Sequence, residues 1–176
     1  NTYNSLGNYQ KAIDYLEESF KIAIEIGDRR VEEGALGNLG YAYQYLSDYR
    51  KAIAYHKKSL KIAIEIGYPR GEGTAYANLG NAYNSLGNYQ KAIDYLEKSL
   101  KIAIEIGDRS LEEGAYGNLG NAYQYLGDNQ KTVEYYKISL KIAIEIDDRD
   151  GVGKAYGSLG NAYESMGNYR KRSEEH

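Results

Sequence analysis

Side chains suited to acid–base or metal chemistry are few in this sequence. It contains two histidines, His56 and His176, and no cysteine, so it offers no disulfide or thiolate metal site and little for histidine-based catalysis. His56 stands where the corresponding segments carry Leu96 and Tyr136, which favours a histidine packed in the core over a ligand or catalyst. We therefore predict no catalytic residue, no metal site and no cofactor.

Paired glutamates are the next candidates for chemistry, at Glu32–Glu33 and Glu112–Glu113. Each pair falls in the first turn of an expected helix, where the helix dipole favours negative charge, and this interpretation outweighs a general acid–base pair. The glycine-rich segment 151–153 lacks the preceding strand and the following Lys-Ser or Lys-Thr of a phosphate-binding loop. Because no nucleophile–base pair is visible, an enzyme is the least favoured class of function.

Carboxamide and phenol groups, in contrast, recur at regular spacing. Asparagine costs a helix roughly 0.6 kcal/mol relative to alanine. Its amide both donates and accepts hydrogen bonds, so a ladder of such groups suits the N–H and C=O groups of an extended peptide. The alternatives are that each Asn bonds a neighbouring helix or is carried along by duplication. The candidate ligand-facing residues are Asn38, Tyr41, Tyr45, Asn78, Asn81, Asn118, Asn121, Tyr125 and Asn161.

The composition indicates internal repetition. The 176 residues include 21 Tyr but one Phe and no Trp, and 20 Gly but one Pro. Such bias arises when a few positions are copied many times. The segment Lys-Ile-Ala-Ile-Glu-Ile begins at Lys21, Lys61, Lys101 and Lys141, at intervals of 40 residues.

Within one unit the pattern predicts a helix, a tight turn and a second helix. Pro69 suits a first helical position, and Tyr76, Leu79 and Tyr83 then lie on one helical face. Gly87-Asn88 interrupts the pattern before the second helix. We expect first helices near residues 29–45, 69–85, 109–125 and 149–165, and second helices near 9–26, 49–66, 89–106 and 129–146.

These spacings resemble the tetratricopeptide signature, here carried by Tyr76, Leu79, Gly80, Tyr83, Ala92 and Leu96. The usual period is about 34 residues, and the longer 40-residue period with its Leu-Gly-Asn triplets is similar to the repeats of the LGN/Pins scaffolds. The resemblance implies an all-α, right-handed superhelical solenoid of antiparallel helix hairpins. We expect a single array, comprising a partial repeat at 1–27 (second helix only), repeats at 28–67, 68–107 and 108–147, and a partial repeat at 148–176.

Such solenoids bind extended partners along a concave face that the first helices line. We expect Asn78, Asn81, Asn118 and Asn121 to be accessible to solvent on this face. The three candidate tyrosines are either anchors for apolar or proline side chains of a ligand or part of the packing. The glycines inside the first helices, Gly40, Gly80, Gly120 and Gly160, are interpreted as sites of close helix packing.

Two classes of function remain. The first is a scaffold that binds an extended peptide and performs no chemistry. The second is a structural module that associates head to tail, because hairpins incomplete at the two ends would expose complementary faces. The residues expected on these faces are Tyr9, Ile13, Leu16 and Phe20 at one end and Tyr156, Leu159 and Tyr163 at the other.

Charge and hydropathy limit the classes of partner that the chain is expected to bind. The net charge is −3 and well mixed along the chain, so no basic face for nucleic acid is expected. No apolar run approaches the roughly 20 residues of a membrane span, and the first residues do not read as a signal peptide. A cytoplasmic protein that binds another protein is therefore the expectation.

Overall fold

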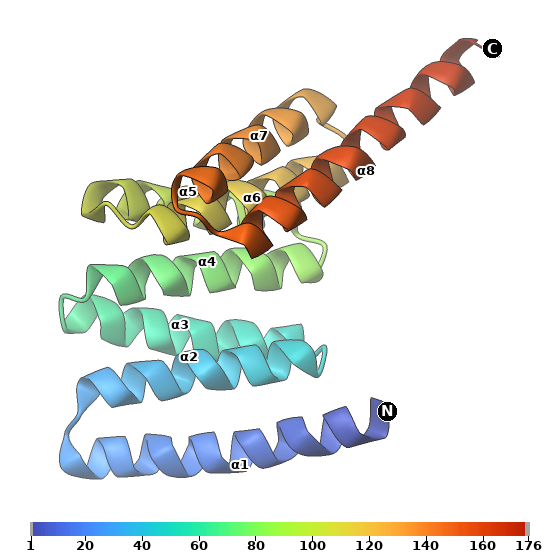
Figure 1. The fold of residues 1–176 in the computed structure, drawn as a ribbon. Helices are drawn as coiled ribbons and strands as arrows, with labels where there is room; N and C mark the ends of the chain where they lie inside the picture. Colours follow the sequence, from blue (N-terminus) through green and yellow to red (C-terminus); the bar gives the residue numbers. More distant parts are fainter. Residues whose placement is uncertain (1, 175–176) are drawn as a thin grey trace.

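The computed structural model describes the backbone of residues 2–174 and the side chains of residues 8–167. Within this part every element is an α-helix, none is long and apolar enough to cross a membrane, and consecutive helices pack as antiparallel hairpins (Figure 1). The prediction of an all-α array is confirmed. The helices are α1 (Thr2–Ile26), α2 (Arg29–Tyr45), α3 (Tyr49–Glu65), α4 (Pro69–Ser85), α5 (Tyr89–Ile106), α6 (Arg109–Leu126), α7 (Asn129–Glu145) and α8 (Arg149–Glu174).

Most internal turns combine a residue in the left-handed region with a side chain that caps the next helix. The turn before α4 is the exception, since Tyr68 makes no capping bond there and Pro69 begins the helix. Before α6, Gly107 has φ +69° and the Asp108 carboxylate accepts a hydrogen bond from the Leu111 N–H at 3.0 Å. Ser47 and Asp147 occupy the same left-handed position without being glycine, at φ 60° and 55°. Two short-range signals therefore define where each helix ends and the next begins.

The internal helices agree with the predicted ranges to within one residue, whereas the outermost helices do not. The predicted start of a helix near Tyr9 is wrong, because α1 is continuous from Thr2. The predicted end near residue 165 is also wrong, because α8 continues to Glu174 and projects past α7 (Figure 1). In the last turns of α8 the sequence has Arg172 where the third unit has Ala92, so this segment lacks the apolar face needed to fold back as a second helix.

The first helices form the inner side of the stack. Each helix packs against the next along the chain, and α2, α4, α6 and α8 also contact one another. In the described part of the chain, α1, α3, α5 and α7 make no contacts among themselves. The first helices are thus the closer-spaced layer, as expected of a concave face.

Glycines allow the close approach within hairpins. A Cβ placed on Gly80 would lie 2.5 Å from Cγ of Leu96, and one on Gly120 would lie 2.5 Å from Cε1 of Tyr136. Gly40 meets the His56 ring in the same way. The packing interpretation is confirmed for these three glycines and is wrong for Gly160, where an added Cβ would meet no atom of the described residues within 4 Å.

The faces at the two ends differ in part from expectation. Ile13 is buried against Leu39 of α2, and Leu159 is buried against Tyr136 of α7. The prediction that Leu159 would be open to water is therefore wrong, and Ile13 is not among the residues that the α1 face exposes, because each points toward the neighbouring helix that is present. Tyr9, Leu16 and Phe20 are half-buried. Tyr156 and Tyr163 are exposed as expected, and so is Tyr15 of α1, which was not among the predicted residues.

Candidate interaction groove

Five cavities of about 170 to 380 Å³ lie along the inner face, and residues of the first helices form most of their walls. We call this surface the groove. It is open rather than enclosed, and residues from two or three successive hairpins meet in each cavity. An extended segment is the shape of ligand that such a row of connected hollows accommodates.

The largest cavity, which we call the carboxamide pocket, has a volume of about 380 Å³ and no charged residue in its wall. Besides Ser85, three carboxamide residues of the wall were missing from the predicted set, namely Gln44, Asn84 and Gln124. They follow Tyr41, Asn81 and Asn121 by three residues, and residues at that spacing share a helix face. The signal was therefore present in the sequence. The full wall comprises Gln44, Asn81, Asn84, Ser85, Asn118, Asn121, Gln124 and Tyr125.

The carboxamides differ in how far they are already hydrogen-bonded. Asn121 accepts a hydrogen bond from the Tyr136 hydroxyl at 2.7 Å, and Nδ2 of Asn84 donates to the backbone carbonyl of Asn118 at 3.3 Å. The side-chain amides of Asn81 and Asn118 bond no other described residue. These two amides are half-buried and unbonded, and the Gln44 amide in the same wall also bonds no described residue.

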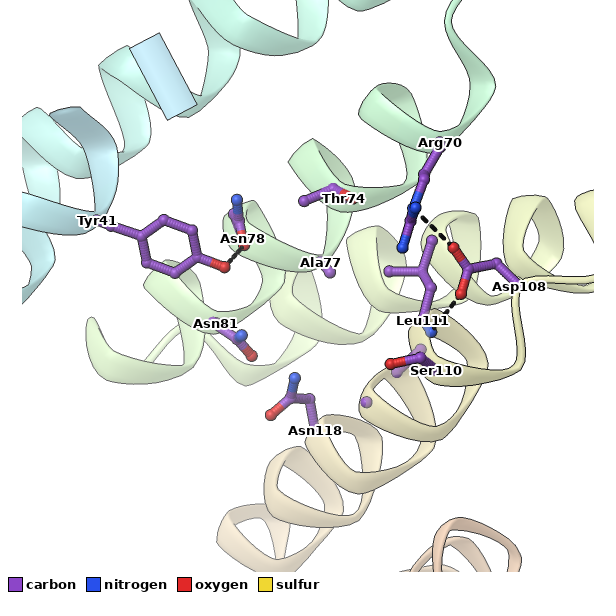
Figure 2. Close-up of a pocket in the computed structure, with 12 residues that line it drawn as sticks. Tyr41, Arg70, Thr74, Ala77, Asn78, Asn81, Asp108, Ser110, Leu111 and Asn118 are labelled. Atoms are coloured by element: carbon purple, nitrogen blue, oxygen red, sulfur yellow. Dashed lines mark hydrogen bonds and ion pairs between the residues drawn. The ribbon is translucent and has the colours of Figure 1, made fainter. Parts of the chain in front are cut away.

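A neighbouring cavity of about 280 Å³ lies between α4 and α6 (Figure 2). Tyr41, Asn78, Asn81 and Asn118 approach it from one side. Arg70 and Asp108 form an ion pair on the other side, with 3.0 Å between Nε and Oδ2 (Figure 2). This pairing leaves the cavity without a net charge.

Asn78 corrects one expectation. Its side chain is only 3% exposed, and its Oδ1 accepts a hydrogen bond from the Tyr41 hydroxyl at 2.5 Å (Figure 2). Burial raises the pKa of Tyr41 above its usual value, so the hydroxyl remains a neutral donor. The predicted accessibility of Asn78 is wrong, because a tyrosine from the preceding first helix covers it. For Asn78 the alternative interpretation therefore applies, in which the side chain bonds a neighbouring helix.

The remaining candidates divide by location. Asn81, Asn118 and Asn121 are half-buried in the groove wall, and Tyr45 and Tyr125 project with about two-thirds of their surface exposed, 67% each. Asn38 is exposed and borders a smaller cavity of about 170 Å³ near the start of α4. Asn161 is exposed on α8 outside the five cavities.

The glutamate pairs serve the helix ends and hairpin contacts. Glu32 and Glu112 are buried and pair with Arg29 and Arg109, each at 2.6 Å. Glu113 accepts a hydrogen bond from Ser139 at 2.6 Å, and its counterpart in the earlier hairpin does the same. These glutamates therefore stabilise helix ends and hairpin contacts, which agrees with the interpretation that they belong to the first turns of helices.

His56 lies in the core as predicted. Its side chain is fully buried against Gly40, and neither ring nitrogen has a hydrogen-bond partner among the described residues. Burial lowers its pKa from 6.5 to about 4. In the described part of the chain, moreover, no three His, Cys, Asp or Glu side chains are grouped so as to hold a metal ion.

Comparison with solved structures shows the same architecture elsewhere. BtubC (BKLC) from P. vanneervenii matches with a TM-score of 0.81 and 21% identity, over 96% of this chain and 70% of that one. A Rap protein complexed with Competence and Sporulation Factor matches with a TM-score of 0.81 and 21% identity, over 97% of this chain and 47% of that one. The signal-transduction ATPase PH0952 from Pyrococcus horikoshii, which has a tetratricopeptide repeat sensor, matches with a TM-score of 0.78 and 28% identity.

The last match covers 92% of this chain but only 25% of that one, so the similarity is to a part of the larger ATPase. No match is found among curated protein sequences. The family model described as tetratricopeptide repeat matches residues 1–65, 31–105 and 111–171. Together with the stacked hairpins and glycine-mediated contacts, these matches show that the chain belongs to the tetratricopeptide repeat family.

Proposed function

We propose that the groove binds an extended peptide segment of a partner protein and performs no chemistry. The observation that carries the proposal is the carboxamide pocket, where Asn81 and Asn118 present unbonded amides on an uncharged wall. Repeats of this family generally mediate protein–protein interaction, which agrees with a binding role.

The hydrogen-bonding chemistry favours a polypeptide backbone. Each free carboxamide can donate to a carbonyl and accept from an N–H, which are the two groups that every residue of an extended peptide repeats. Two further acceptors in the wall, Oε1 of Gln44 and Oδ1 of Asn84, are buried without a donor from the described residues. An unpaired buried acceptor is unfavourable, so a ligand N–H that reached either one would gain free energy.

The charges of the groove favour an uncharged segment. Arg70 is paired with Asp108, and Lys154 at the α8 end is paired with Asp150 at 2.5 Å. Two carboxylates border the groove without an ion pair among the described residues, Glu33 and Glu113, and each already accepts a hydrogen bond from a serine. A strongly acidic peptide would find few free cations along this surface. Affinity should therefore depend only weakly on salt concentration.

A peptide-array screen with the 176-residue chain would test the proposal. Replacing Asn81 or Asn118 with Ala should weaken a selected peptide by about 1–3 kcal/mol where the hydrogen bond is buried, with little change in folding stability. Asn161→Ala is the matched control, since Asn161 is exposed outside the cavities. Binding that survives both groove substitutions unchanged, or that falls equally in the control, would refute the proposal.

The end faces support a second candidate, head-to-tail association. Inside the chain, Tyr95 of α5 stacks on Tyr76 and Tyr83 of α4, with ring centroids 6.1 and 5.4 Å apart. Tyr15 of α1 corresponds to Tyr95 in the repeat, and its ring is 78% exposed.

The other half of this contact is exposed on α8. Tyr156 and Tyr163 correspond in the repeat to the two α4 tyrosines, and both rings are exposed. If α8 of one copy packed on α1 of another, the tyrosine cluster that α4 and α5 form internally would be reproduced between chains. Such a contact is heterologous and would give a ring or a filament.

A further inference from the structure

Tyrosine rings stack between successive hairpins in a regular series. Tyr9 of α1 stacks on Tyr45 at the end of α2, with ring centroids 5.0 Å apart and 11° between the ring planes. Tyr89 of α5 stacks on Tyr125 of α6 with nearly the same geometry, 4.9 Å and 6°. The two pairs occupy equivalent positions, 80 residues apart in the sequence.

Between these two pairs the series is interrupted. The equivalent positions in the intervening hairpins hold Tyr49 of α3 and Ser85 of α4. Because serine has no ring, Tyr49 stacks on no other aromatic side chain among residues 8–167. One half of the stacked pair is thus present without the other.

A cavity of about 290 Å³ lies at this interruption, and we call it the tyrosine slot. Its wall consists of Tyr41, Gln44, Tyr45, Tyr49 and Ser85, with no carboxylate, ammonium or guanidinium group. The slot adjoins the carboxamide pocket, with which it shares Gln44 and Ser85. A ligand lying along the groove therefore passes the slot.

We propose that the tyrosine slot binds one aromatic side chain of the partner's extended segment, an inference that rests on the proposed peptide-binding function. The ligand ring would stack on Tyr49, in the place that the Tyr125 ring holds against Tyr89. Adjacent carboxamides would bind the peptide backbone on the α4–α6 side. The chain itself thus shows, at two equivalent positions, the contact that the ligand would complete.

The same comparison indicates which side chains fit. Offset stacking favours aromatic over aliphatic groups beyond the area buried. In the internal counterpart, the Tyr125 hydroxyl makes no hydrogen bond to another described residue, and most of the side chain is exposed. Phenylalanine and tyrosine should therefore serve about equally well, whereas leucine should bind less tightly. A charged side chain would lose hydration in the slot without gaining a countercharge.

The hairpin at the C-terminal side offers no second slot of this kind. There the equivalent positions are Asn129 and Ser165, so neither member of the ring pair is present. Among the described hairpins, only the junction of α3 and α4 has a ring on one side and an unfilled position on the other. The preference should accordingly concern a single aromatic residue of the ligand.

The substitution Ser85→Tyr tests this directly, because it supplies from the chain the ring that the ligand would provide. Tyrosine already occupies the equivalent place in α2 and α6, so the helix should accept it. The probe is a library of uncharged peptides that differ only in carrying Phe, Tyr, Leu or Ala at one central position. The original chain should retain the aromatic members roughly two- to tenfold better than the Leu members, and Ser85→Tyr should abolish that preference while still retaining peptides.

Ser165→Tyr is the matched control, since it makes the same substitution at the equivalent position of α8, outside the five cavities, and leaves the slot intact. Tyr49→Leu removes the stacking surface by an independent route, and circular dichroism verifies that each variant is folded. An aromatic preference that persists in both Ser85→Tyr and Tyr49→Leu would overturn the slot while leaving the peptide groove standing. If the original chain retains no peptide of the library, the proposed function fails and the slot fails with it.

Discussion

The hydroxyl of Tyr41 on α2 donates a hydrogen bond to Oδ1 of Asn78 on α4, 37 residues along the chain, at 2.5 Å. The contact joins two successive first helices across the groove. The contact also distinguishes two equivalent residues. The ring of Tyr41 covers Asn78, whereas Asn118, the counterpart of Asn78 in the next unit, has no tyrosine at the equivalent position.

Replacing Tyr41 with Phe should therefore destabilise the fold. The substitution removes the donor and leaves the Asn78 carbonyl buried without a partner, which costs about 1–3 kcal/mol. Tyr45→Phe is the control, because the Tyr45 ring is largely exposed and should tolerate the change. Urea denaturation would measure both, and equal midpoints for the two variants would contradict the prediction.

The pH dependence of stability should report on His56. Its pKa is about 4 in the folded chain and about 6.5 when unfolded, so the unfolded chain takes up the proton first as the pH falls. The stability associated with the neutral, buried ring is complete above pH 6.5 and is lost as the pH falls toward 4. Over this window the free energy of unfolding should decrease by about 3 kcal/mol.

The control for this effect is His56→Leu, which copies the residue at position 96. The variant should lose that part of the slope between pH 6.5 and 4, and removing two unpaired ring nitrogens should raise stability at low pH. Unfolding midpoints across this pH range would give the comparison. Parallel curves for the two proteins would show that His56 does not titrate in this way.

Replacing two equivalent glycines with alanine should change the stability of the fold in opposite directions. At Gly80 the new methyl group would meet the Leu96 side chain, and overpacking of this kind costs about 1–3 kcal/mol. At Gly160 it would meet no atom of the described residues within 4 Å, so the helix should gain about 1 kcal/mol. Thermal unfolding would measure both, and a shift in the same direction would mean that the contact at Gly80 is not tight.

Head-to-tail association should depend on the exposed tyrosines at the ends. We expect the average mass of the 176-residue chain to rise with concentration, and Tyr15→Glu or Tyr163→Glu to reduce that rise by placing a charge in an apolar contact. Sedimentation equilibrium would measure the mass. Tyr125→Glu adds the same charge at an exposed tyrosine away from either end face. A mass that stays monomeric into the hundreds of micromolar would exclude this association.

The sequence predicted the hairpins well because their signals are local. Pro69, the capping Asp108 and the left-handed Gly107 each act within a few residues of a helix end, and the 40-residue period repeats most of the capping and glycine signals. The exact family was also recognisable, although the narrower resemblance to the LGN/Pins repeats stays a prediction. The continuation of α8 was not predicted. A glycine alone does not end the helix there, because the chain turns back only where the following segment has an apolar face that can pack as a second helix.

The groove was predictable only as a helix face. Periodicity places Asn78 and Asn118 on the same stripe, but the cover over Asn78 comes from Tyr41 of another hairpin, and no local pattern reports it. Similarly, Ser85 appears unremarkable until the structure shows that its counterparts, Tyr45 and Tyr125, are members of stacked pairs. Contacts between repeats decide these differences, and near-identical repeats conceal them.

The alternation of Ser85 with the tyrosines at 45 and 125 also bears on how a ligand is aligned. In an array of identical hairpins, an extended chain could shift by one hairpin and make the same contacts, so several alignments would be equal in free energy. Here an aromatic side chain shifted by one hairpin would meet the Tyr89–Tyr125 pair, where the place is already taken. If the tyrosine slot binds an aromatic side chain as proposed, the missing ring therefore gives the ligand one alignment along an otherwise repetitive surface.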